Sequence, residues 1–393
     1  MVSRTDIPSI VLPILMTGFV GLVSGCSLIK PAPERYGVAA LRGASELLRE
    51  ARVETSEEGL PVARDFLVEE LAGDDGSRGS LERRVIRTTR DPALVLPDSF
   101  AALSAAERRR VAIVIVPGTQ TGFGGPSMTR PCLREAANRA EALGFSTHFI
   151  DTPPRGGVPE NAELVAEWVE PIFKEADHVV LVMLSKGAHD VVYYLQHYAL
   201  DLPPQDRAKL NMVLSLAGTL QGSVVADYFA NAARFSPVCT RIFLCMRGQS
   251  ADIGMLKTVA RSPWQAEEAG RMGEAFPHLT WVSVAMIPDG ADGEIAQRLW
   301  SPFVRGRIVN NSPYYSPADG LVESAASVLP DEVEVDEWIV RAFGSHSMPN
   351  GHYIDGTLVA PVTQRAGDEQ LHPESGGEVM DAYLRALPQS LLR

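Results

Sequence analysis

Between residues 111 and 344 the chain alternates continuous apolar runs with amphipathic segments of helical length. Runs rich in Val and Ile predict strands buried on both faces, and the segments between them predict helices. We therefore expect an α/β fold, with a mostly parallel central sheet and helices on both faces. The expected strands are 111–118, 145–151, 178–184, 209–218, 276–287 and 334–344, and the expected helices include 132–144, 160–176 and 191–200.

Two long segments interrupt this alternation. Residues 222–275 have mixed helical sequence, and residues 288–316 are rich in Pro, Gly and Asn. Both follow expected strands, and right-handed crossovers bring the C-terminal ends of parallel strands to one edge of the sheet. We therefore expect lid-like insertions at that edge. The main domain is expected to span residues 106–393, after a helical and β extension at residues 37–105.

The first residues predict export from the cytoplasm. Arg4 precedes an apolar run at 7–23, which is barely long enough to span a bilayer and contains two prolines. Val23-Ser24-Gly25-Cys26 then resembles a bacterial lipobox. The resemblance implies removal of residues 1–25, diacylation of Cys26 and a tether at residues 26–36. It also implies a lipid-anchored protein of the bacterial cell envelope, and Ser27 favours the outer over the inner membrane.

The composition narrows the classes of partner. The formal net charge is −13, which argues against electrostatic binding to nucleic acid or to anionic lipid. Cys239 and Cys245 are close enough in sequence to form a disulfide in an oxidising compartment, leaving Cys132 free, but three buried thiols fit equally well. No His/Cys pair has the spacing of metal ligands, so we expect no metal and no cofactor. The sequence leaves the oligomeric state open.

The apolar run at 178–184 ends at a lone hydroxyl. Ser185 is followed by Lys186 and Gly187, and then by an apolar helical segment. A strand–Ser–helix joint with a glycine two residues after the serine is the arrangement of a nucleophile elbow. By itself, Ser185 could equally be an ordinary helix N-cap.

At this joint the chain resembles the α/β-hydrolase family, over roughly residues 110–390. The family usually has a glycine two residues before the nucleophile, and this chain has Met183 there. The resemblance implies a serine nucleophile at Ser185. It also implies an oxyanion hole formed by two backbone N–H groups, those of Thr119 and Lys186.

The resemblance also implies an acid and a base in the order Ser, Asp or Glu, His. Residues 316–330 resemble the Asn-Asp-Gly-Leu-Val segment of bacterial lipases, which implies that Asp319 is the acid; the alternatives are a turn aspartate that caps a helix, or Asp227 as the acid. His346 follows the last expected strand and is the expected base, with His352 as the competitor.

Two other interpretations use the same residues. Gly118, Gly122 and Gly124 follow a strand with the glycine spacing of a dinucleotide-binding loop, but no tyrosine has a lysine four residues later, as short-chain dehydrogenases require. The chain could also be an α/β-hydrolase fold without activity, serving as a binding or envelope-structural module. We expect a serine hydrolase of the esterase or lipase type, which acts on a small-molecule or lipid ester.

Overall fold

The fold was analysed in a computed structural model of the chain. The structure describes residues 45–71, 84–85, 103–119, 129–154, 156–223, 226–227, 258–259, 261–287, 316–319, 321–343, 353–354 and 357–358.

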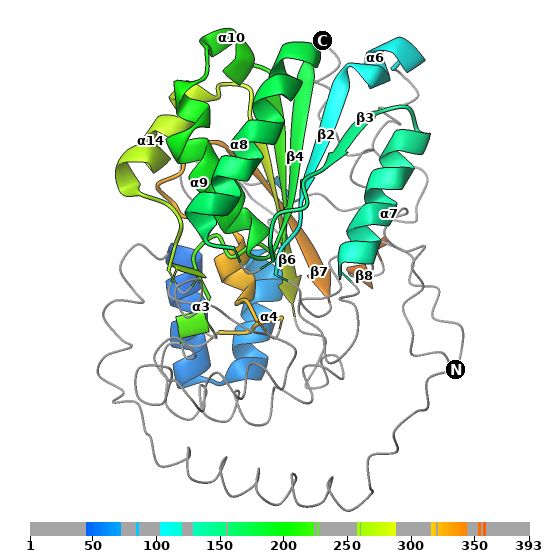
Figure 1. The fold of residues 1–393 in the computed structure, drawn as a ribbon. Coiled ribbons are helices and arrows are strands. Elements are labelled where there is room, and N and C mark those ends of the chain that lie inside the picture. Colours follow the sequence, from blue (N-terminus) through cyan, green and yellow to red (C-terminus); the bar gives the residue numbers. More distant parts are fainter. Residues whose placement is uncertain are drawn as a thin grey trace, which may run out of the picture.

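Seven parallel strands form the central sheet, in the order β1-β7-β6-β5-β4-β2-β3 (Figure 1). A separate antiparallel pair joins β8 (Tyr353–Ile354) to β9 (Thr357–Leu358). The sheet strands are β1 (Arg84–Val85), β2 (Val111–Val116), β3 (Ser146–Phe149), β4 (His178–Leu184), β5 (Leu210–Leu216), β6 (Thr280–Ile287) and β7 (Asp336–Phe343).

Helices cover both faces of the sheet. The alternating side chains of the strands form two apolar clusters, one against α7 and one against α8, α9 and α14. This arrangement confirms the predicted α/β class, with a parallel sheet between helical layers. The helices described are α3 (Glu46–Glu57), α4 (Leu60–Glu70), α6 (Ala105–Arg109), α7 (Thr129–Ala142), α8 (Val158–Glu175), α9 (Gly187–His197), α10 (Pro204–Arg207) and α14 (Ala266–Ala275), with 3-10 turns η1 (Ala199–Asp201) and η2 (Ser324–Ser327).

The helices α3 and α4 form a hairpin at the end of the sheet where β6 and β7 terminate (Figure 1). Leu48 and Leu67 of this hairpin share an apolar cluster with Ile287 and Ile339 of the sheet, and with Ala325 of η2. The hairpin therefore covers part of the sheet end formed by the C-terminal ends of the strands, where the functional residues are expected. The short strand β1 of the same N-terminal region pairs with β7.

Strands β2 to β7 lie within the expected runs, and β1, β8 and β9 were not among the expected strands. Helix α9 has an earlier start than expected. Helix α9 begins at Gly187, four residues before the expected start at Val191. Within the described ranges, no helix is both long and apolar enough to cross a membrane. The expected signal peptide, most of the two expected lid-like insertions, and Cys239 and Cys245 lie outside the described residues.

Candidate active site

Ser185 stands at a strained joint between β4 and α9. Its φ is 55°, in the left-handed region that a residue with a Cβ adopts only at a cost. The Ser185 N–H donates to the Leu216 carbonyl at 3.1 Å, and its carbonyl accepts the Ala188 N–H at 3.0 Å. The residue that caps α9 is Lys186, so the interpretation of Ser185 as an ordinary helix N-cap is wrong. Ser185 is half-buried, whereas its neighbours in β4 and α9 are buried.

Two glycines bring the neighbouring backbone up to this joint. A Cβ on Gly118 would lie 2.5 Å from the Leu184 carbonyl oxygen and 2.9 Å from the Ser185 Cβ. A Cβ on Gly187 would lie 2.6 Å from the Val116 carbonyl oxygen. The turn after β2 therefore touches the serine directly, and only glycine permits that approach.

Met183, which takes the place of the family's glycine, does not disturb this packing. Its side chain is fully buried in the apolar cluster beneath α8 and α9, together with Ala188. The methionine thus faces the helical layer, and the close contacts at the joint are made by the backbones of Gly118 and Gly187.

The two predicted oxyanion donors flank the serine. Lys186 follows Ser185 directly, and Thr119 follows Gly118, whose Cα is next to the serine. Within the described ranges, neither the Lys186 nor the Thr119 N–H donates to a protein acceptor. An oxyanion hole needs backbone N–H groups that are not already bonded to a protein acceptor and that point to the place where negative charge develops.

The side chain of Lys186 is held in the core. Its Nζ lies 2.7 Å from Asp190 Oδ1 and 3.0 Å from Oδ2, and both side chains are buried. Asn161 Nδ2 of α8 donates to Asp190 Oδ2 at 2.8 Å and to the Pro153 carbonyl at 3.1 Å. Burial raises the pKa of Asp190 to about 6, although Lys186 and Asn161 pull it down. This network ties the first turn of α9 to α8.

His189 lies near the serine without the properties of a base. It is fully buried, with Nδ1 2.6 Å from Thr219 Oγ1 and Nε2 3.0 Å from the Arg261 carbonyl oxygen. Burial lowers the pKa of His189 to about 4, so the ring is neutral at physiological pH. Since Nε2 must donate to the Arg261 carbonyl and Nδ1 accepts from Thr219, both nitrogens are engaged.

Asp319, the predicted acid, lies in a buried turn that we call the acid turn, described at residues 316–319 and 321–324. Its Oδ1 accepts the N–H groups of Leu321 and Val322 at 3.0 and 2.8 Å. Its own N–H donates to the Val322 carbonyl at 3.0 Å. Asp319 is fully buried, and the Ser324 hydroxyl ties the acid turn to the Met286 carbonyl near the end of β6. Asp319 thus stabilises a turn, as the alternative interpretation expected, and this turn is bonded near the C-terminal end of β6, at the same end of the parallel sheet as the end of β4. Its role as the acid stays a prediction.

The other predicted candidates are less fully described. Asp227, the alternative acid, is half-buried in the segment after β5, and its N–H donates to the Ser223 carbonyl. His346 and His352 both lie outside the described residues, after β7. Cys132 lies in α7, and its side chain is not among those described. Among the described residues, no cluster of His, Cys, Asp and Glu could hold a metal ion.

A parallel sheet with a strained serine at a strand-to-helix joint defines the α/β-hydrolase fold, which the sequence predicted. Among solved structures, the chain is similar to a metagenomic carboxyl esterase, at 17% identity and a TM-score of 0.45, over 89% of this chain and 94% of that one. It is also similar to the mature lipase BlEst2 of Bacillus licheniformis, at 18% identity and a TM-score of 0.37, over 61% and 86%.

A third similar structure is carboxyl esterase 2 of the fungus Tuber melanosporum, at 14% identity and a TM-score of 0.35, over 72% of this chain and 79% of that one. No protein-family model and no curated protein sequence matches the chain.

Proposed function

We propose that this chain is a serine hydrolase of the esterase or lipase type, which cleaves small-molecule or lipid carboxylic esters. The observation that carries the proposal is the position of Ser185: a half-buried residue with φ 55° at a strand-to-helix joint, approached closely by the Gly118 backbone. Strain of this kind gathers at functional sites, and the described residues without glycine show it at Ser185 and at Ala217, which follows the neighbouring strand β5.

The proposed reaction follows the acyl-transfer scheme. The Ser185 Oγ attacks the acyl carbon while His346 takes its proton, and the N–H groups of Thr119 and Lys186 bind the oxyanion. His346 then gives the proton to the leaving alcohol, and water attacks the acyl-enzyme in the same way. Asp319 would hold the imidazole in the required tautomer and orientation. This chemistry needs no cofactor.

The first test is covalent labelling of the full chain with a fluorophosphonate, followed by peptide mapping. We expect one adduct, on Ser185, and none in Ser185→Ala, which should also lose at least about 10³-fold in turnover of a model ester. A folded wild-type protein that forms no adduct would contradict the proposal and favour a binding module.

The remaining assignments are tested with the same ester. Asp319→Asn keeps an oxygen that can accept the Leu321 and Val322 N–H groups, so the turn should persist while kcat falls by about 10³- to 10⁴-fold. Unchanged turnover in this variant would exclude Asp319 as the acid. His346→Ala and His352→Ala identify the base, because only the base variant should lose activity to the level of Ser185→Ala.

We also propose that the protein is anchored in the bacterial cell envelope by lipid on Cys26. The support is the lipobox-like segment Val23-Ser24-Gly25-Cys26 at the end of the apolar run, with Ser27 favouring the outer membrane. A lipid-anchored hydrolase would meet its substrate at or near a membrane surface.

A further inference from the structure

Glu323 closes the base of the acid turn. Its Oε1 accepts the Ser316 N–H at 3.0 Å and the Ser316 hydroxyl at 2.9 Å, and Ala318 forms an isolated antiparallel bridge with Glu323. Asp319 stands between these two ends of the turn. A shift of the Glu323 carboxylate would therefore be passed to Asp319 through the short backbone loop that joins them.

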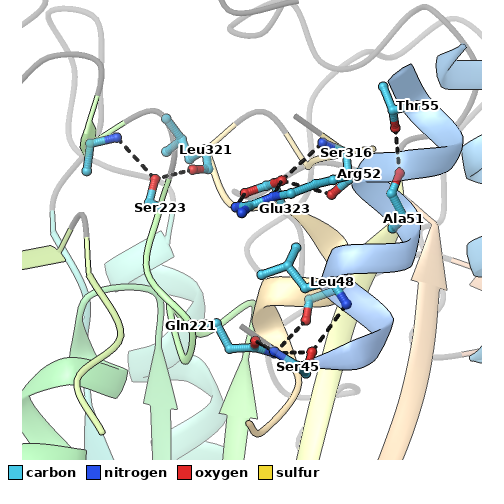
Figure 2. A network of polar contacts seen from close by, with 12 residues as sticks. Ser45, Leu48, Ala51, Arg52, Thr55, Gln221, Ser223, Ser316, Leu321 and Glu323 are labelled. Carbon is cyan, nitrogen blue, oxygen red and sulfur yellow. Dashed lines mark hydrogen bonds and ion pairs between the residues drawn. The ribbon is translucent and has the colours of Figure 1, made fainter. Parts of the chain in front are cut away.

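The partner of this carboxylate comes from the N-terminal hairpin. Arg52 of α3 donates from Nε to Glu323 Oε1 at 2.9 Å and from Nη2 to Oε2 at 2.6 Å, a two-pronged ion pair with 6% and 1% of the side chains exposed (Figure 2). Burial by itself would lower the pKa of Arg52, but the Glu323 carboxylate outweighs it and raises that pKa. Such paired, charge-assisted bonds fix orientation as well as distance.

A second junction fixes the start of the same helix. Gln221, in the segment after β5, accepts the Ser45 N–H at 2.7 Å and donates to the Ser45 hydroxyl at 2.9 Å. The same amide nitrogen, Nε2, also lies 3.1 and 3.0 Å from the carbonyl oxygens of Ala325 and Val328, so its two hydrogens are shared among three acceptors. Ser45 is also the N-cap of α3, with its hydroxyl accepting the Leu48 N–H (Figure 2). The helix that carries Arg52 is thus placed relative to the acid turn independently of the ion pair.

We propose that Arg52 is a positioning residue for the acid: through Glu323 it holds the acid turn, and with it Asp319, in the geometry that the catalytic base requires. This inference rests on the proposed function. It assigns the α3–α4 hairpin a role in the reaction. Removal of Arg52 would leave the buried Glu323 carboxylate without its ion-pair partner. That carboxylate would then have to bind water or move.

The test compares Arg52→Met, Arg52→Lys and Arg64→Met in the full chain, with kcat and KM for a model ester. Arg64 is the control, because it lies on α4 of the same hairpin in an ion pair with Asp65, with 28% and 75% of the side chains exposed. We expect Arg52→Met to lower kcat by about 10- to 100-fold with KM changed less than about 3-fold. Arg52→Lys keeps the positive charge but cannot form the two-pronged pair, so it should recover only part of the loss, and Arg64→Met should resemble the wild type. Equal kcat in Arg52→Met and Arg64→Met would overturn the proposal.

A double variant covers the case in which Arg52→Met does not fold. Arg52→Met with Glu323→Gln removes the stranded charge but keeps an oxygen for Ser316, so only the bond between α3 and the acid turn is lost. A folded double variant with reduced kcat supports the proposal, and one with wild-type kcat contradicts it.

Amide hydrogen exchange separates this inference from the proposed function. The Leu321 and Val322 N–H groups report the Asp319 turn directly, since both donate to its Oδ1. We expect faster exchange at both residues in Arg52→Met, or in the double variant, with β4 and β5 protected as in the wild type. Unchanged exchange at Leu321 and Val322 would refute the positioning role. If wild-type Ser185 takes no fluorophosphonate, the proposed function fails, and exchange still decides whether Arg52 holds the turn.

Discussion

At the scale of single residues, the site combines one strained backbone position with several fully bonded ones. Ser185 has φ 55°, whereas Asp319 and Lys186 are held by hydrogen bonds or an ion pair. The joint forces the serine backbone into the left-handed region. As a result Ser185 is half-buried, although the strand that precedes it is buried. The strain therefore lies at the proposed nucleophile, and Ala217 after β5 has the same kind of backbone conformation, with φ 44°.

This strain predicts an unusual ranking of two inactive variants. Ser185→Ala and Ser185→Gly both lose the hydroxyl, but only alanine keeps the Cβ that disfavours φ 55°. We expect Ser185→Gly to be more stable than Ser185→Ala by about 1 kcal/mol in urea denaturation, the reverse of the usual order in regular structure. A less stable glycine variant would show that the joint is not strained.

The residues of the site differ in how far the sequence could reveal them. Ser185 and Asp319 stand in short local patterns, a strand–Ser–helix joint and an Asp-Gly-Leu-Val segment, so both could be singled out. Arg52 and Gln221 could not, because their partners lie 271 residues (Arg52 to Glu323) and 176 residues (Gln221 to Ser45) away. Local periodicity carries no information on such pairs. The burial of Lys186 could not be predicted either, because lysine side chains are ordinarily exposed.

At the scale of elements, the start of α9 and the turn after β2 pack backbone against backbone. The sequence predicted the strands well because buried parallel strands are continuous apolar runs. It placed α9 too late because Gly187 and Ala188 do not look like the start of an amphipathic helix. Gly187 is at that position for close approach rather than for helix propensity.

Two glycine variants should therefore change stability in opposite directions. In Gly187→Ala the new Cβ would lie 2.6 Å from the Val116 carbonyl oxygen and 3.0 Å from that of Pro117, so we expect a loss of about 1–3 kcal/mol and of most activity. Gly270→Ala on α14 meets nothing within 4 Å and should gain about 0.8–1.0 kcal/mol from helix propensity. Denaturant titration of both variants checks this, and a neutral Gly187→Ala would contradict the close approach.

At the scale of the whole molecule, the N-terminal hairpin follows the expected lipid anchor and tether in the sequence, and it packs against the end of the sheet where β6 and β7 terminate (Figure 1). The expected tether at residues 26–36 ends shortly before Ser45, the first described residue. The sequence predicted helices in this region but not their place. Helices α3 and α4 are separated at Gly59, whose φ is 93°.

The proposed lipid anchor on Cys26 predicts that the protein is found in the membrane fraction of the cell. In a bacterial host, the full chain should sediment with membranes and incorporate radiolabelled palmitate, whereas Cys26→Ser should lose the label. The variant should keep its ester turnover, because the cysteine is outside the proposed catalytic machinery. The control is Cys132→Ser, which should retain both the label and the membrane fraction. Palmitate on Cys26→Ser would show that another residue is modified.

The ion pair between Arg52 and Glu323 has a consequence for the order of biogenesis. Its partners are separated by 271 residues, and β1 likewise pairs with β7. Contacts of such long sequence separation form late in folding. A chain still emerging from the ribosome, or still threading through a secretion channel, has its serine joint but lacks the segment that would complete the acid turn. The hydrolase proposed here would therefore lack a complete acid turn until Glu323 has been delivered.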